Sequence, residues 1–309
     1  MSDILITEFM ADAAVDGLRS DFDVDYDPSL ADDQGAIPAR LAGARAIIVR
    51  NRTQVTADLL DAVPSVKCVG RLGVGLDNID MAGAKDRGVT VYPALGANNL
   101  SVAEYVIENA MILLRGANNK MAAMLAGEWP RQAASGRELS GKTLGLVGYG
   151  SIAQDTAGIA QALGMSTIAF DPFLPADSGA WGGTKQASLD DVLAAADVVT
   201  LHVPLTDGTK HLINADALKK MKKDAFVINT ARGGVVDEQA LVDAMNAGEI
   251  GGAALDVFET EPLTAEAAEK FKGQTNLILT PHIAGVTAEA NTRVSHMTAD
   301  LVRKHLENN

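Results

Sequence analysis

Short runs of β-forming residues alternate with helical patterns along almost the whole chain. In the first third, runs at 4–7, 22–26, 46–49, 66–69 and 89–91 predict strands, and 56–62 and 81–87 predict helices. Alternation of this kind is typical of a parallel sheet with helices on its faces. A longer helix is predicted over 99–114, and it is apolar on most sides, which predicts that it is buried.

A second series of the same kind begins after three glycines, at 127, 136 and 141. Strands are predicted at 143–147, 166–170, 198–201, 225–228, 252–255 and 277–279, and helices at 151–163, 189–195, 215–221 and 238–247. Six strands in about 140 residues match the size of a dinucleotide-binding unit. A final amphipathic helix is predicted over 287–306. The 309 residues therefore suggest about two α/β domains.

The charge of the chain excludes several classes of partner. Lysine and arginine number 26 against 40 acidic residues, so the net charge is −14. Such a surface repels nucleic acid and anionic lipid, and no uncharged apolar run reaches about 18 residues. The N-terminus lacks the basic start of a signal peptide, so we expect a cytoplasmic protein with neither a nucleic-acid nor a membrane partner. The single cysteine, Cys68, is expected to be a buried strand thiol, and His296 and His305 are expected at the surface.

A glycine-rich turn is the first chemical signal. Residues 143–153 read as a strand, a tight turn and a helix, in which Gly148, Gly150 and Ala153 fit G-x-G-x-x-A. The helix N-terminus would then bind a pyrophosphate. Asp171 follows Gly150 by 21 residues and ends a predicted strand, as expected for an acid that accepts the ribose hydroxyls of NAD. No arginine follows it directly, which favours NAD over NADP. An ordinary α/β turn with a chance acid is the alternative.

Polar side chains follow three further predicted strands, where parallel sheets bind ligands. They include Arg232, the glutamates within 255–262, and His282. Arginine can hold a carboxylate with two hydrogen bonds, and histidine can take a hydroxyl proton while hydride leaves the same carbon. A glutamate beside that histidine would orient it and stabilise its charged form. Each residue alone could equally be an ion-pair former, a solvated acid or a strand-end histidine.

Seven motifs carry a resemblance to a known family. They are GRLGVGLDNID (70–80), NNLSVAEY (98–105), GLVGYGSIAQ (145–154), LHVPLT (201–206), NTARGGVVDE (229–238), ALDVFETEP (254–262) and PHIAG (281–285). With them the chain resembles the D-isomer-specific 2-hydroxyacid dehydrogenases, phosphoglycerate dehydrogenase-like branch. It is also similar to the family's bacterial sulfolactate dehydrogenases, particularly in IVRNRTQV (48–55). The resemblance implies an oxidoreductase that transfers hydride between C2 of a D-like 2-hydroxy acid and NAD.

The resemblance also implies roles for single residues. Arg232 would bind the substrate carboxylate, His282 would be the general acid and base, and Glu261 rather than Glu259 would be its partner. Backbone N–H groups of Val74 and Gly75 would help to bind the carboxylate. The implied NAD-binding residues are Val102, Gly148, Tyr149, Gly150, Ser151, Ile152, Asp171, His202, Val203, Pro204, Thr209, Thr230, Ala231, Arg232, Asp256, His282 and Gly285. No metal site is expected.

The family further implies two Rossmann-like, doubly wound parallel-sheet domains with a cleft between them. The substrate domain would be discontinuous, with residues 1–98 and 288–309, and the NAD domain would be 99–287. Family members are usually dimers built through the NAD domain and the long helix near 99–114, so a homodimer is expected.

Three arginines bear on the substrate. Arg50, Arg52 and Arg71 follow predicted strands of the first domain, and the related phosphoglycerate dehydrogenases have arginine at positions matching Arg50 and Arg71. They favour an acid with a second anionic group, such as 3-phosphoglycerate or 3-sulfolactate. Alternatively, these arginines pair with some of the many acids. The sequence leaves two other functions open. One is a hydroxypyruvate or glyoxylate reductase, and the other is a non-catalytic, NAD-sensing protein similar to the family's corepressors.

Overall fold

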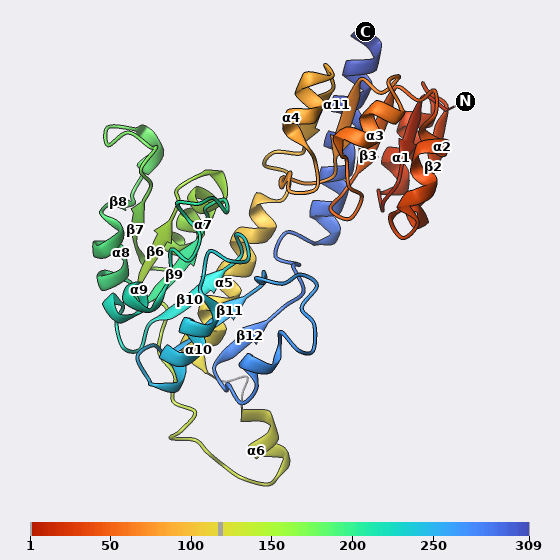
Figure 1. The fold of residues 1–309 in the computed structure, drawn as a ribbon. Helices are drawn as coiled ribbons and strands as arrows, with labels where there is room; N and C mark the ends of the chain where they lie inside the picture. Colours follow the sequence, from red (N-terminus) through yellow and green to blue (C-terminus); the bar gives the residue numbers. More distant parts are fainter. Residues whose placement is uncertain (1, 117–119, 309) are drawn as a thin grey trace. The chain divides into compact units, whose positions relative to one another are not determined.

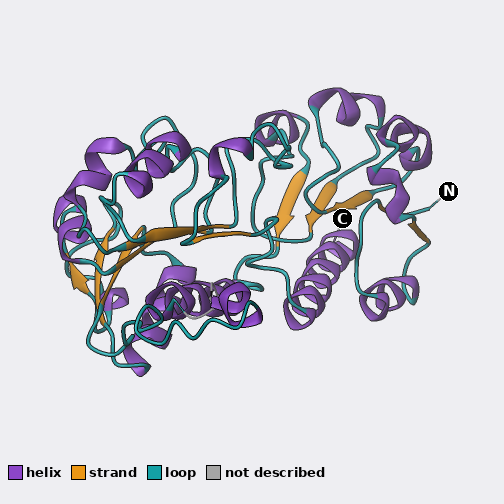
Figure 2. Ribbon diagram, turned by 90° about the horizontal axis from the view of Figure 1, so that it is seen from below, coloured by secondary structure: helices purple, strands orange, loops and turns teal. Residues whose placement is uncertain are grey.

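The computed structural model describes residues 2–116 and 120–308. They form two compact units (Figure 1), one running to Asn98 and resuming at Val286, the other comprising Asn99–Gly285. Each unit is a parallel sheet with helices on both faces (Figure 2). The predicted doubly wound α/β class is therefore confirmed. None of the described helices has the length and apolar character needed to cross a membrane.

The first unit has a five-stranded sheet in the order β2-β1-β3-β4-β5. The strands are β1 (Ile4–Ile6), β2 (Val24–Tyr26), β3 (Ala46–Val49), β4 (Cys68–Arg71) and β5 (Thr90–Pro93). The helices are α1 (Asp12–Arg19), α2 (Ile37–Leu41), α3 (Ala57–Ala62), α4 (Met81–Asp86) and α11 (Ala288–Asn308), with 3₁₀ turns η1 (Pro28–Ala31) and η2 (Gln34–Ala36). The sequence analysis missed α1 and α2, which follow alanines and have no side-chain cap to mark where they begin.

The structure confirms the predicted burial or exposure of two side chains in this unit and contradicts it for a third. Cys68 is fully buried in β4 as expected, and burial raises the pKa of its thiol to about 12. The expectation for His305 was wrong, because its ring is half-buried in α11 and packs edge-on against Tyr92. Its Nδ1 lies 3.0 Å from the Tyr92 hydroxyl. His296 is exposed on the same helix, as predicted.

The second unit has a seven-stranded sheet in the order β12-β11-β10-β9-β6-β7-β8. Its strands are β6 (Thr143–Val147), β7 (Ser166–Phe170), β8 (Lys185–Gln186), β9 (Val198–Leu201), β10 (Phe226–Asn229), β11 (Gly252–Leu255) and β12 (Leu277–Leu279). The helices are α5 (Asn99–Arg115), α6 (Met121–Leu125), α7 (Ser151–Ala162), α8 (Leu189–Ala195), α9 (Ala215–Lys220) and α10 (Glu238–Asn246), with η4 (Gly179–Trp181) and η5 (Glu269–Phe271). Only β8 and α6 were not expected among these strands and helices.

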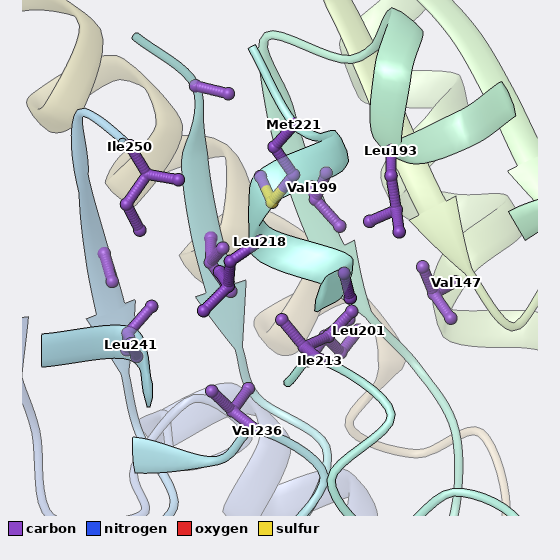
Figure 3. Close-up of a cluster of buried hydrophobic side chains, with 14 of the residues drawn as sticks. Val147, Leu193, Val199, Leu201, Ile213, Leu218, Met221, Val236, Leu241 and Ile250 are labelled. Carbon is purple, nitrogen blue, oxygen red and sulfur yellow. The ribbon is translucent and has the colours of Figure 1, made fainter. Parts of the chain in front are cut away.

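An apolar cluster fixes the strand ends of this sheet. Figure 3 shows Leu193 of α8 and Leu218 of α9 over the strand residues Val147, Val199 and Leu201. All five are almost completely buried, and replacing one such leucine with alanine typically costs about 2–5 kcal/mol. Because the last residues of β6 and β9 are anchored in this cluster, the loops that follow them start from fixed positions.

Candidate active site

The turn after β6 requires glycine at one position and leaves open space at another. Gly148 has φ +86°, and a Cβ there would lie 2.6 Å from the His202 carbonyl oxygen. A Cβ on Gly150 would meet nothing within 4 Å. Gly150 is also the N-cap of α7, so no side chain of the described residues caps the first N–H groups of that helix. This open backbone and the helix dipole fit a phosphate group.

Asp171 is held beside this turn at the end of β7. Its carboxylate accepts hydrogen bonds from the Tyr149 N–H (2.8 Å) and the Phe173 N–H (2.9 Å). A carboxylate has further lone pairs, so it retains the capacity to accept from two ribose hydroxyls. The Tyr149 ring is buried and stacks on Trp181, with 5.0 Å between ring centroids, so its side chain supports the turn from behind.

Two further polar side chains lie near this turn: His202 follows β9 and Thr230 follows β10. The hydroxyl of Thr230 is buried and has no hydrogen-bond partner among the described residues, as expected if a ligand supplies one. The Nε2 of His202 lies 3.1 Å from the Thr200 hydroxyl. Burial lowers the pKa of His202 to about 4, so this histidine is neutral at physiological pH. The turn, Asp171 and Thr230 together fit a dinucleotide.

His202 should make the protein more stable as the pH rises from about 4 to 6.5. In this interval an unfolded histidine binds a proton that the folded one does not, so the free energy of unfolding increases with pH. The gain from this residue is at most about 3 kcal/mol. Urea unfolding at both ends of the interval should show a smaller increase for His202→Gln than for the exposed-site control His296→Gln. Equal increases in the two variants would contradict the assignment.

The other predicted cofactor residues lie mostly on loops at the carboxyl ends of the strands. Ser151 and Ile152 begin α7, and the remaining ones are Val203, Pro204 and Thr209 after β9, Ala231 and Arg232 after β10, Asp256 after β11, and His282 and Gly285 after β12. Val102 is the exception, because it is buried in α5.

His282 and Glu261 form a pair in the same unit. Nδ1 of His282 lies 2.8 Å from Oε2 of Glu261, and Oε1 of Glu261 accepts from the Phe258 N–H at 3.0 Å. Burial raises the pKa of Glu261, but the two hydrogen bonds and the positive charges of His282 and Arg232 lower it further than burial raises it. Glu261 is therefore ionised at neutral pH and can accept from Nδ1–H. Glu259 points elsewhere, with Oε1 lying 3.2 Å from Nε2 of His211.

His282 has a strained backbone that its neighbours hold in place. Its φ is +56°, a conformation rarely adopted by a residue with a side chain. The His282 N–H donates to the Asp256 carbonyl at 2.9 Å, and the buried Asp256 carboxylate accepts from the N–H groups of Ile283 (2.8 Å) and Ala284 (2.7 Å). Strain maintained in this way is common at functional sites.

Asp256 thus has a second, structural role in holding the His282 loop, which the sequence analysis missed. Its Oδ1 also accepts from the Thr280 hydroxyl at 2.6 Å, and that hydroxyl is hydrogen-bonded to Tyr105 of α5. The hydrogen bonds that link Tyr105, Thr280 and Asp256 support the loop that carries His282. Thr280, directly before Pro281-His282, is the sequence feature that could have indicated this role.

Arg232 lies on the loop after β10, close to the Glu261 loop. A Cβ on the next residue, Gly233, would lie 1.7 Å from the Phe258 carbonyl oxygen, so only glycine allows the two loops to pack so closely. The Arg232 carbonyl accepts from the Asn229 amide at 3.0 Å. The structure therefore brings Arg232, Glu261 and His282 together within one unit.

A buried charge network behind these loops was also missed. The carboxylate of Glu238, almost fully buried, accepts from the Glu259 N–H at 2.7 Å and from Lys270 Nζ at 2.8 Å. The Glu238 N–H in turn donates to Glu259 Oε1 at 3.3 Å. These reciprocal bonds join the start of α10, which follows the Arg232 loop, to the loop that carries Glu261.

The predicted substrate residues of the first unit divide into different environments. Arg52 is exposed and ion-paired with Asp32, which is the alternative that the sequence left open. Arg71 ends β4 and donates to the Leu72 carbonyl at 3.2 Å, and Val74 and Gly75 are half-buried in the loop that follows.

Arg50 is half-buried, and burial lowers the pKa of its guanidinium, an effect that the charge of Glu8 partly offsets. Its Nη2 donates to Asn291 Oδ1 at 3.0 Å. No carboxylate of the described residues lies within ion-pair distance of it. Within the same residues, no group of three or more His, Cys, Asp or Glu side chains could hold a metal ion.

Comparison with known proteins identifies the family. The family model "D-isomer specific 2-hydroxyacid dehydrogenase, NAD binding domain" matches residues 107–284. The chain is 52% identical to the (S)-sulfolactate dehydrogenase of Chromohalobacter salexigens over 99% of both sequences. It is 40% identical to the hydroxypyruvate reductase of Thermotoga maritima over 84% of both.

A solved structure agrees with these relatives. The D-lactate dehydrogenase of Aquifex aeolicus, in complex with NAD and lactic acid, superposes with a TM-score of 0.86 and 28% identity, covering 99% of this chain and 96% of that one. NAD as the cofactor is thereby confirmed. The chain belongs to the D-isomer specific 2-hydroxyacid dehydrogenase family.

Proposed function

We propose that the chain is a cytoplasmic dehydrogenase that oxidises the C2 hydroxyl of a D-like 2-hydroxy acid with a second anionic group on C3. The unit from Asn99 to Gly285 is the NAD domain, and the other unit is the substrate domain. The observation that carries the reaction is the 2.8 Å contact between His282 and Glu261, with Arg232 nearby.

In the proposed oxidation, the C2 hydroxyl loses its proton to a base while C2 loses its own hydrogen as a hydride. Ionised Glu261 accepts from Nδ1–H of His282, which leaves the Nε2 lone pair available as a base. Nε2 takes the hydroxyl proton while Arg232 holds the substrate carboxylate with two hydrogen bonds. NAD, when bound, supplies the hydride acceptor. The product is the 2-oxo acid, and the reverse reaction returns the proton from His282.

Arg50 is the residue that suits a second anion on the substrate. Arg40, Arg45 and Arg87 of this unit each pair with an aspartate. Half-buried Arg50 has no carboxylate within ion-pair distance among the described residues. A buried cation without a counter-ion is costly, so an anionic ligand suits it. The 52% identical sulfolactate dehydrogenase supports 3-sulfolactate as the substrate, ahead of 3-phosphoglycerate.

The experiment is an assay of NADH formation over matched acids. Each acid with a C3 anion is paired with its counterpart without one, namely 3-sulfolactate with D-lactate and 3-phosphoglycerate with D-glycerate. We expect the highest kcat/KM with 3-sulfolactate. Faster reduction of hydroxypyruvate or glyoxylate would favour the reductase function. NADH binding without turnover of any acid would favour a non-catalytic, NAD-sensing protein.

Asp171→Ala should weaken NAD binding by about 10- to 100-fold, because hydrogen bonds to a charged carboxylate are worth about 1.5–3 kcal/mol. NADP binding should change far less, since a carboxylate repels its 2′-phosphate. Fluorescence titration with both reduced nucleotides measures the two dissociation constants. Asp177→Ala, at an exposed position of the same segment, is the control. An unchanged preference for NAD would contradict the ribose role.

We also propose that two copies of the chain associate through the NAD domain. Helix α6 and the residues after it carry large exposed side chains, including Leu125 (83% exposed) and Trp129 (77% exposed). Figure 1 shows α6 on a segment that extends away from the sheet of its own unit. Exposed apolar side chains gathered on such a segment are suited to an interface, and a second copy is the partner that family members usually have.

Trp129→Ser should shift the protein from dimer towards monomer, because interface tryptophans often contribute 2 kcal/mol or more, about 30-fold in affinity. Sedimentation velocity over a concentration series measures the shift. Phe173→Ser, which removes an exposed aromatic side chain after β7 of the same unit, is the control and should leave the mass unchanged. A monomeric wild-type protein, or a dimeric Trp129→Ser variant, would contradict this interface.

A further inference from the structure

Glu8 is a buried carboxylate that follows β1. The residue is only 4% exposed, and its side chain accepts hydrogen bonds from four successive N–H groups of the loop after β3. The shortest distances are 2.8 Å to Arg50, 3.3 Å to Asn51, 3.2 Å to Arg52 and 2.9 Å to Thr53. The loop therefore wraps its backbone around one carboxylate.

This arrangement stabilises the negative charge without an ion pair. Among the described residues, no lysine or arginine lies within ion-pair distance of Glu8, so the four N–H groups replace the water lost on burial. The far end of the loop is fixed separately. The Thr53 hydroxyl lies 2.9 Å from that of Thr7, and the Asn78 amide donates to the Thr53 carbonyl at 2.6 Å. In the middle of the loop, Glu8 accepts from the N–H groups of Asn51 and Arg52, while the Gln34 amide donates to the Arg52 carbonyl at 3.0 Å. Glu8 is the group that binds all four successive N–H groups.

The position of the loop in the sheet is informative. In the order β2-β1-β3-β4-β5, the chain proceeds outward from β1 on one side and from β3 on the other. Doubly wound sheets bind ligands outside the carboxyl ends of the strands at such a reversal. Glu8 follows β1 and Arg50 follows β3, so both belong to the two loops at the reversal. Arg50 is also the half-buried cation without a carboxylate partner.

We propose that Glu8 is a positioning residue for substrate specificity. By holding the backbone of residues 50–53, it presents the Arg50 guanidinium to the C3 anion of the substrate. The inference rests on the proposed function, because it assumes a substrate with that second anion. Glu8 itself touches no substrate, and its carboxylate is fully used by the loop.

The test is Glu8→Gln, which keeps the size of the side chain but replaces one acceptor oxygen with an NH₂ group that faces N–H donors. The quantity to measure is the ratio of kcat/KM for 3-sulfolactate to kcat/KM for D-lactate. We expect this ratio to fall by about 10- to 100-fold, as for the loss of a charge-assisted hydrogen bond, mainly through a higher KM for 3-sulfolactate. A purely structural role would lower activity with both acids equally and leave the ratio unchanged.

Two further variants make the result specific. Asp58→Asn removes an exposed negative charge from α3 of the same unit and should leave the ratio unchanged. Glu8→Asp keeps the charge but withdraws it by one methylene group, and should lower the ratio less than glutamine does. It serves as the test if Glu8→Gln does not fold.

The two proposals fail in different ways. If wild type does not prefer 3-sulfolactate or 3-phosphoglycerate over the matched acids, the proposed second anion is wrong and the role of Glu8 falls with it. If wild type has the preference and both Glu8 variants keep it, only the positioning role is wrong.

Discussion

Replacing His282 with alanine is expected to lower kcat by about 10²- to 10⁴-fold while NAD still binds. The variant loses the base that takes the C2 hydroxyl proton, whereas the glycine turn, Asp171 and Thr230 stay intact. Glu261→Gln should lower kcat less, because the amide can still accept from Nδ1–H but no longer stabilises a charged imidazole. This order of losses distinguishes a proton-transfer residue from its orienting partner.

Steady-state assays with 3-sulfolactate and NAD give kcat, and fluorescence titration gives the NADH dissociation constant. His296→Ala, at an exposed position of α11, is the matched histidine control and should retain wild-type kcat. Turnover within a few-fold of wild type in His282→Ala would refute the acid–base role. A lost NADH affinity would instead mean that the substitution disturbed the strained loop.

Much of the fold followed from local sequence patterns. Gly148 and Gly150 predicted the turn only together with Asp171, 21 residues after Gly150. The structure gives the reason for the glycines: a Cβ at Gly148 would clash with the His202 carbonyl, and a Cβ at Gly150 would stand in space suited to a phosphate. Strands buried on both faces also read clearly as apolar runs. The two-residue edge strand β8 was missed because Lys185 and Gln186 are exposed and lack any apolar pattern. Helix α6 was missed because its five residues, Met-Ala-Ala-Met-Leu, are all apolar and show no alternation of apolar and polar positions.

The supporting contacts of the site were harder to predict. That Asp256 holds the His282 loop, or that Glu238 and Lys270 join two loops, depends on side chains far apart in the sequence. Glu8 shows the same limit, since it binds a loop more than forty residues away along the chain. Sequence spacing predicts which strand end carries a polar residue, but long-range hydrogen bonds depend on tertiary packing.

Arg50→Met is expected to lower kcat/KM for 3-sulfolactate by about 10- to 150-fold, while kcat/KM for D-lactate changes little. Methionine fills a similar volume but offers no donors to the sulfonate. The preference of wild type should also weaken as salt screens the charge of Arg50. Arg52→Met should cost less, because Asp32 already pairs with Arg52. Arg87→Met, which breaks an ion pair with Asp61 in the same unit, is the control and should leave the preference unchanged.

The melting temperature of Arg50→Met tests the same role, and it is expected to change in the opposite direction to kcat/KM. Replacing a half-buried cation that has no carboxylate partner with an apolar side chain is expected to leave Tm unchanged or to raise it. A residue retained for stability would show a lower Tm, whereas one retained for binding would lose activity without losing Tm. If Arg50→Met lowers Tm and leaves the preference for 3-sulfolactate intact, Arg50 is structural and the second anion must be bound elsewhere.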